Sequence, residues 1–161
     1  MPMTATIIRW DTCKEDFRGD GSLRDIYITP ATLADWQAVY SLVRGYSGVE
    51  FLVDGAVQLL PDSVEQAFAI RLSASPMLRF SIGRVLVAFH FFTSEEIECD
   101  FVPNEVTSQV DLDALLAFVR QLGDATSKRV VITPENVSEH PFITYDPQIR
   151  EFEHHEVVAL V

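Results

Sequence analysis

Apolar residues recur along this chain at two different spacings, and each spacing predicts one type of secondary structure. Steps of three and four residues place apolar side chains on one face of a helix, whereas strict alternation places them on one face of a strand. The helical spacing occurs three times. The predicted helices run from Thr29-Pro30 to Gly45 or Gly48, from Asp62 to Leu72, and from Asp111 to Gly123. Each begins at a residue type that caps helices, and two end at glycine.

Alternating apolar residues predict the strands. These are residues 5–10, 23–28, 49–53, 57–59, 78–82, 85–92, 97–101 and 129–133, with a short strand at 142–145. The first two predict a hairpin with a long loop, and Asp54-Gly55 favours a type I′ hairpin turn between the next two. Residues 78–101 predict a three-strand meander. Its middle strand, Val85–Phe92, is almost continuously apolar, which is typical of a central strand buried on both faces. The third strand, Ile97–Phe101, alternates with acidic residues, which predicts one face in water.

The order of these elements predicts the fold class. Hairpins outnumber strand–helix–strand crossovers, which favours an α+β fold over a doubly wound one. We therefore expect a largely antiparallel mixed sheet, built of hairpins and the meander and packed by about three helices. No low-complexity linker divides the chain, so residues 1–161 are expected to form a single domain. The apolar residues at the end, Val157–Val161, predict a docked segment, in one interpretation a sheet strand.

The charge balance makes this an acidic domain. The 161 residues hold 24 acidic and 12 basic side chains, which gives a formal net charge of −12. No Lys or Arg lies between Arg84 and Arg120, whereas several acidic residues do. Such a chain repels phosphate backbones and anionic membrane surfaces, which argues against binding to nucleic acids and membranes. It favours basic partners, cations, or simply a well-solvated surface of bacterial type.

The N-terminal sequence and the cysteines favour a cytoplasmic protein. The first residues lack the basic and apolar regions of a signal peptide, and the longest apolar run is too short to span a bilayer. Cys13 and Cys99 form neither a CxxC pair nor a zinc spacing, and two cysteines suit a reducing compartment. Cys13, beside Lys14 in a predicted loop, is expected to be the more reactive thiol, because the neighbours of Cys99 are acidic.

Catalytic and cofactor motifs are absent from the sequence. There is no GxGxxG or GxxxxGK[ST] motif, and Gly45-Tyr46-Ser47-Gly48 is not a GxSxG nucleophile elbow, so we predict no catalytic residue and no cofactor. The densest group of metal-ligating residue types is Glu151–Glu156, where His154 and His155 are the candidate metal ligands. Because neighbours on a strand point to opposite faces, only alternate members such as Glu153 and His155 could share one site.

We interpret the sequence as that of a non-enzymatic protein-binding or inhibitor module for a basic partner. A small, acidic α+β chain without catalytic motifs is similar to bacterial immunity and inhibitor proteins, which block basic partners such as toxin nucleases. This similarity is one of composition and transfers no residues. The candidate partner-binding residues are Glu95, Glu96, Glu98 and Asp100, at the acidic edge of the meander, where they would steer association.

Two alternatives remain open at this point. A small hydrolase or metal-dependent enzyme would use carboxylates together with His140, His154 or His155. A structural subunit would form a homo-oligomer by pairing Val157–Val161 at the edge of a sheet.

Overall fold

One nine-stranded sheet organises the structure. The computed structural model describes residues 7–156. Its strands pair in the order β3-β2-β4-β5-β6-β1-β7-β8-β9, and every neighbouring pair is antiparallel. The strands are β1 (Arg24–Ile28), β2 (Glu50–Val53), β3 (Ala56–Gln58), β4 (Pro76–Ile82), β5 (Val85–His90), β6 (Ile97–Phe101), β7 (Val130–Pro134), β8 (Ile143–Asp146) and β9 (Glu151–His154). The predicted α+β fold with a largely antiparallel sheet is therefore confirmed.

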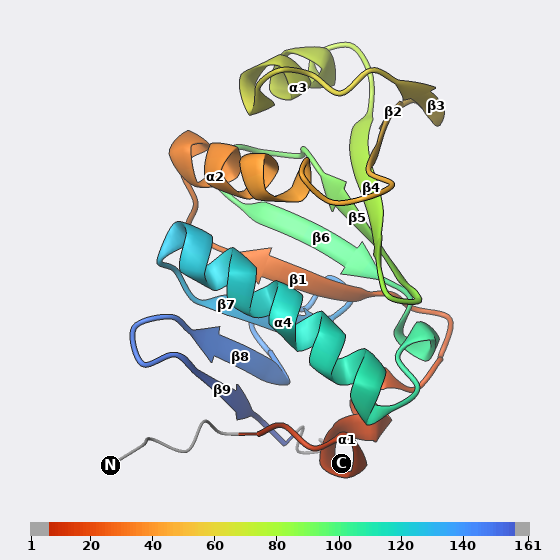
Figure 1. Cartoon of the computed structure of the whole chain (residues 1–161), viewed down its shortest axis with the longest axis vertical. Coiled ribbons are helices and arrows are strands. Elements are labelled where there is room, and N and C mark those ends of the chain that lie inside the picture. The colour runs from red at the N-terminus through yellow and green to blue at the C-terminus, as the bar shows by residue number, and fades with distance from the viewer. Residues whose placement is uncertain (1–6, 157–161) are drawn as a thin grey trace.

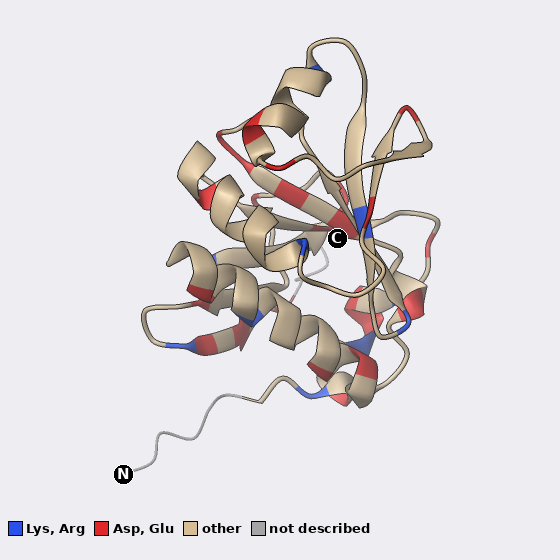
Figure 2. Ribbon diagram, turned by 45° about the horizontal axis from the view of Figure 1, so that its top comes forward, with Lys and Arg blue, Asp and Glu red and all other residues tan. Residues whose placement is uncertain are grey.

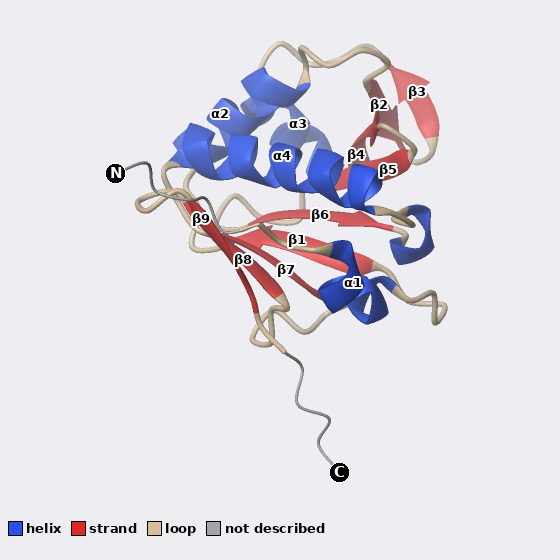
Figure 3. Cartoon of the chain, turned by 60° about the horizontal axis from the view of Figure 1, so that its bottom comes forward, coloured by secondary structure: helices blue, strands red, loops and turns tan. Residues whose placement is uncertain are grey.

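The long helices cover one face of this sheet, as Figures 1 and 3 show. They are α2 (Leu33–Val43), α3 (Val64–Arg71) and α4 (Gln109–Thr126). A shorter helix, α1 (Trp10–Cys13), continues into the 3-10 turn η1 (Lys14–Phe17), and a second 3-10 turn, η2 (Pro103–Glu105), follows β6. The backbone N–H of Trp10 donates to the side chain of Gln109, so α1 lies beside the first turn of α4. No helix within residues 7–156 is long and apolar enough to cross a membrane.

The helix starts follow capping chemistry at positions slightly different from those predicted. The hydroxyl of Thr32 accepts from the backbone N–H of Asp35, whose carboxylate accepts in return from the N–H of Thr32. This reciprocal pair starts α2, so the start predicted at Thr29-Pro30 is too early. Similarly, Ser108 caps α4 by accepting from the N–H of Asp111, which was itself the predicted cap.

Gly123 does not end α4, which continues to Thr126. The predicted stop is wrong because this glycine meets a packing requirement instead. A Cβ atom at residue 123 would lie 2.5 Å from Cδ1 of Tyr145 on β8. The helix thus needs a residue without a side chain here in order to approach the sheet. It ends in the left-handed conformation of Ser127, with a φ of 56°.

Two of the three predicted strand groupings are confirmed. Asp54 and Gly55 have φ angles of 49° and 83°, as a type I′ turn requires, and they connect β2 to β3. Strands β4, β5 and β6 form the predicted meander. The first predicted hairpin is wrong within the described residues, because Trp10 begins a helix and β1 pairs with β6 and β7. The predicted docking of Val157–Val161 falls outside the described residues.

The core lies between the sheet and the helices. Aromatic side chains from both layers meet there; they include Trp36, Tyr40, Phe80, Phe89 and Phe118. Strand β5 buries Val85, Val87 and Phe89 on this side, whereas Leu86 on its other side is 42% exposed. The prediction that this strand is buried on both faces is therefore wrong, because helices pack against only one face. We call the other side of the sheet the open face.

Candidate functional site

Strand register brings a continuous row of side chains together on the open face. The row crosses all nine strands through cross-strand partners: Val57, Leu52, Met77, His90, Glu98, Tyr27, Val131, Thr144 and Glu153. A second row, two residues along, contains Glu50, Arg79, Ala88, Asp100, Asp25 and Thr133. Since directly paired residues lie about 5 Å apart, the polar members form one cluster at the centre of the sheet. We call Asp25, Tyr27, His90, Glu98 and Asp100 the central cluster.

One half of the central cluster is built around the hydroxyl of Tyr27. This hydroxyl lies 2.9 Å from Oδ2 of Asp25 and 3.2 Å from Oε1 of Glu98. Asp25 is only 2% exposed, and its Oδ2 also accepts the backbone N–H of Asn136 at 2.8 Å. A tyrosine has one hydroxyl proton, so it can donate to only one of the two carboxylates at a time.

Burial and mutual repulsion shift the pKa values of these groups upward. Burial raises the pKa of Asp25, and the charges of Asp100 and Glu135 add to that effect. Burial likewise raises the pKa of Glu98, and the nearby charge of Asp25 raises it further. Burial and the hydrogen bond to Asp25 raise the pKa of Tyr27, which stays protonated. The sheet thus holds the carboxyl groups of Asp25 and Glu98 close together, which makes it less favourable for both to be ionised.

The other half of the central cluster is an imidazole–carboxylate pair. Nε2 of His90 lies 2.7 Å from Oδ2 of Asp100. Burial disfavours the imidazolium, but the hydrogen bond and charge of Asp100 outweigh it and raise the pKa of His90. The ring of His90 also stacks on Phe92, with centroids 5.1 Å apart. Within residues 7–156 no hydroxyl or thiol is hydrogen-bonded to His90.

Two hollows flank the central cluster on the open face. The larger one, about 570 Å³, is partly apolar, and its lining includes Leu52, Met77, His90 and Phe92. The smaller one, about 280 Å³, lies beside Tyr27, Val131 and Thr144. The segment after β7 reaches over the open face here, since Asn136 contacts Asp25 and Pro141 lines the smaller hollow. The cluster is therefore covered toward β7 and accessible toward β5.

Exposed apolar residues surround the accessible part of the cluster. Phe92 is 57% exposed beside His90, and Leu86 projects from the same side of β5. Val102, which follows β6, is also exposed, and Val57 is exposed three strands away from His90, on β3. Exposed apolar residues grouped beside polar ones are found on surfaces that contact another molecule. Acidic residues lie on strands and helices alike, with fewer basic ones among them (Figure 2).

Of the four predicted partner-binding residues, the structure brings Glu98 and Asp100 together on the open face. Glu95 and Glu96 lie in the predicted turn between β5 and β6, at the end of that face. Their backbone carbonyls accept hydrogen bonds from the N–H of Ala31 and the indole N–H of Trp36, respectively. The turn is thereby fixed to the segment at the start of α2. Glu96 remains close enough for its charge to contribute to the raised pKa of Glu98.

Asp25, Tyr27 and His90 were not among the residues predicted from the sequence to form a site. A signal for the first two was present, because Asp25 and Tyr27 alternate with Ile26 and Ile28 in the predicted strand. Nothing local, however, indicated that this strand lies next to β6. His90 interrupts the apolar run of Val85–Phe92, and its spacing along the chain assigned it to no site.

The candidate metal ligands point apart, as expected of neighbours on a strand. Nε2 of His154 lies 2.8 Å from Oδ2 of Asp16, whereas Nε2 of His155 lies 3.0 Å from the hydroxyl of Thr144. Oε1 of Glu153 lies 3.8 Å from Nδ1 of His155. Among the described residues, no group of three or more His, Cys, Asp or Glu side chains could hold a metal ion.

Both cysteines are free and buried in the core. Burial and the charge of Asp16 raise the pKa of Cys13 to about 11. Complete burial raises the pKa of Cys99 well above its usual value. The predicted loop position of Cys13 is wrong, because this residue ends α1 with its thiol inside the protein.

Comparisons with known proteins add no relative. No protein-family model, curated protein or solved structure matches this chain.

Proposed function

We propose that this protein is a non-enzymatic binding module that receives a basic protein partner on the open face of its sheet. The observation that carries the proposal is the central cluster, in which Asp25, Glu98 and Asp100 are held on adjacent strands beside exposed apolar residues. The charge of −12 supports it, because an acidic protein attracts basic partners and raises their association rate.

The central cluster has more hydrogen-bond acceptors than donors. Each carboxylate offers about four lone-pair positions. The donors found among the described residues are the hydroxyl of Tyr27, the N–H of Asn136 and the imidazole of His90. An arginine guanidinium supplies five N–H donors in a planar arrangement that suits carboxylates. An arginine of the partner, placed between Glu98 and Asp100, would supply donors and reduce the repulsion that, in addition to burial, raises the pKa of Glu98.

The apolar neighbours of the cluster would supply the rest of the interface. The energetically important part of a protein interface is usually a few desolvated aromatic and arginine contacts surrounded by residues that exclude water. Phe92 stands at this position, since it stacks on His90 and lines the 570 Å³ hollow together with it. We therefore assign the open-face side of β5 and β6 as the contact region, with the partner's cation over Glu98 and its apolar side chains against Phe92.

The proposal is tested by capture from a lysate of the cells that encode the protein. The open-face variant combines Glu98→Gln with Phe92→Ala. The control combines Glu65→Gln in α3 with Leu72→Ala directly after it, which removes one carboxylate charge and one large apolar side chain from exposed positions in the opposite layer. Circular dichroism and thermal unfolding check that both variants fold.

A basic protein should be retained by the wild type and the control at low salt. It should be retained at least tenfold less by the open-face variant, and less by every form at high salt, because exposed charges are screened. Equal retention by both variants would contradict the assigned surface. Retention that does not change with salt would contradict the electrostatic part of the proposal.

A further inference from the structure

A second surface, separate from the central cluster, lies at the edge of the sheet. Within residues 7–156, strand β9 pairs with β8 alone, and its other edge has no strand partner there. The N–H of His155 donates to the carbonyl of Phe142, so in this antiparallel pair the backbone of His155 points toward β8. Backbone groups in such a pair point alternately toward and away from the neighbour. Those of Glu151 and Glu153 therefore point to β8, and those of Phe152 and His154 point outward.

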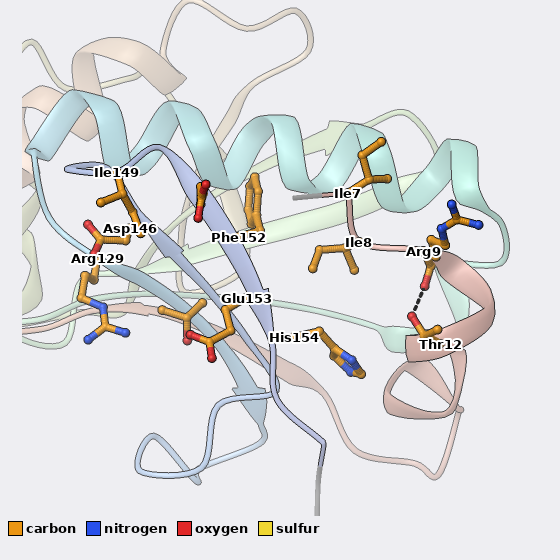
Figure 4. Close-up of a pocket in the computed structure, with 12 residues that line it drawn as sticks. Ile7, Ile8, Arg9, Thr12, Arg129, Asp146, Ile149, Phe152, Glu153 and His154 are labelled. Atoms are coloured by element: carbon orange, nitrogen blue, oxygen red, sulfur yellow. Dashed lines mark hydrogen bonds between the residues drawn. The ribbon is translucent and has the colours of Figure 1, made fainter. Parts of the chain in front are cut away.

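The outward edge of β9 borders a hollow of about 420 Å³. The segment Ile7–Arg9 lies across from β9, and Phe152 and His154 point to the side of the strand on which Ile8 lies (Figure 4). Glu153 points to the other side, on which Arg129 lies. Among the backbone hydrogen bonds of residues 7–156, none joins Phe152 or His154 to a segment beyond this edge. The hollow therefore contains backbone donors and acceptors that an extended chain could pair with.

The two sides of this edge differ in chemistry. On the helix side, Ile8 and Phe152 are buried, while Ile7 exposes apolar surface beside α4. On the open-face side, the carboxylates of Asp146, Glu151 and Glu153 lie with the guanidinium of Arg129, and Arg9 lines the hollow from the segment across from β9. Side chains of an added strand would alternate between these two environments. Its residues on one side would meet apolar groups, and those on the other would meet an excess of carboxylates.

A second copy of this chain is a poor occupant of the edge. If two β9 strands pair antiparallel through their outward residues, the two registers with the most overlap place Glu151 opposite Glu153 or Glu153 opposite its own copy. Like charges directly opposite each other destabilise a strand pair. A strand with Lys or Arg at these positions gains from the same geometry. The glutamates therefore disfavour self-pairing and favour a basic sequence.

We propose that the open edge of β9 binds an extended peptide segment in which basic residues alternate with apolar ones, by adding it to the sheet as a tenth strand. Such strand addition takes its affinity from main-chain hydrogen bonds and its specificity from alternate side chains. The proposal does not depend on the open-face function, because the central cluster lies several strands away.

The test uses synthetic peptides and the full chain. One seven-residue peptide alternates Lys and Val, a second has the same composition with all Lys before all Val, and a third alternates Glu and Val. We expect only the first to bind the wild type by fluorescence anisotropy. Its binding should shift the NMR amide signals of Phe152 and His154 more than those of the central cluster. N-methylation at alternate residues of that peptide should abolish binding.

A charge exchange at the edge provides the specificity test. Glu153 has a 71% exposed side chain, so Glu153→Lys should leave the fold intact. This substitution should lower the affinity for the alternating Lys/Val peptide about fivefold and should allow the Glu/Val peptide to bind. Glu65→Lys, the same change on α3, should alter neither affinity. The proposal is overturned if the alternating Lys/Val peptide binds no better than the peptide with all Lys before all Val, or if no peptide binds. It is also overturned if the amide signals of Phe152 and His154 shift with protein concentration alone, which would indicate self-pairing.

Discussion

Replacing Glu98 with glutamine separates the binding role of the central cluster from its contribution to stability. Glu98→Gln keeps the size of the side chain and can keep a hydrogen bond with Tyr27, but it removes the charge that faces Asp25. We expect the variant to unfold less readily than the wild type at pH 8 and to bind the basic partner more weakly. Residues that improve function at the expense of stability are typical of binding and catalytic sites.

The pH dependence follows from the direction of the pKa shift. The pKa of Glu98 is raised in the folded protein above its unfolded value of about 4.3. Between these two values the folded state binds more protons than the unfolded state, so the free energy of unfolding falls as pH rises. Glutamine does not titrate and avoids this loss. The difference in the free energy of unfolding between the variant and the wild type should therefore be absent below about pH 4 and should grow toward pH 8. It should grow further as His90 loses its proton, because His90 then no longer attracts Glu98.

The size of the effect can be worked from the hydroxyl of Tyr27. This atom lies 2.9 Å and 3.2 Å from the two carboxylate oxygens. Those oxygens are therefore at most about 6 Å apart, and unit charges at that distance repel by about 3 kcal/mol in a medium of dielectric near 20. Glu98 is only partly buried, so water screens much of this repulsion. We expect a gain of about 1 kcal/mol after that screening.

Urea unfolding at pH 4, 6 and 8 measures this effect in the wild type, Glu98→Gln and a control. The control is Glu153→Gln, which removes a charge from a well-exposed residue in the same row of the open face. It should change the free energy of unfolding by less than about 0.5 kcal/mol at every pH. A Glu98→Gln protein that is less stable than the wild type at pH 8, or equally shifted at all three pH values, would refute the reasoning.

Two further predictions concern the core. Gly123→Ala should destabilise the protein by about 1–2 kcal/mol despite the better helix propensity of alanine, because the new Cβ would overlap the ring of Tyr145. The hydroxyl of Tyr145 is bonded to Asp124 at 2.6 Å, which restrains that ring. Gly45→Ala, whose Cβ would meet only ordinary contacts, should change the melting temperature little, and equal effects of the two would show that packing is not the cause. Cys13, with its pKa raised to about 11, and the fully buried Cys99 should react with a thiol reagent only on unfolding, and fast labelling of either in the native protein would contradict their burial.

Local patterns in the sequence were sufficient for the parts of the fold that depend on neighbouring residues. The turn at Asp54-Gly55 and the meander were predicted because their signals lie within one segment. The place of β1 between β6 and β7 was not, because pairing between distant strands has no local signature. For the same reason, alternation identified Glu98 and Asp100 as residues on a wet face but could not place Asp25 beside them. Gly123 shows the converse, since a local stop signal was overridden by packing against β8.

Carboxyl footprinting of the isolated complex tests the open-face proposal most directly. The captured partner is bound to the full chain, exposed carboxylates are labelled with a carbodiimide, and the label at each Asp and Glu is measured by mass spectrometry. We predict that labelling of Glu98 and Asp100 falls at least fivefold in the complex, whereas labelling of Glu65 on α3 is unchanged. Protection of Glu65 with unchanged labelling of Glu98 and Asp100 would place the partner on the helical layer and contradict the proposal.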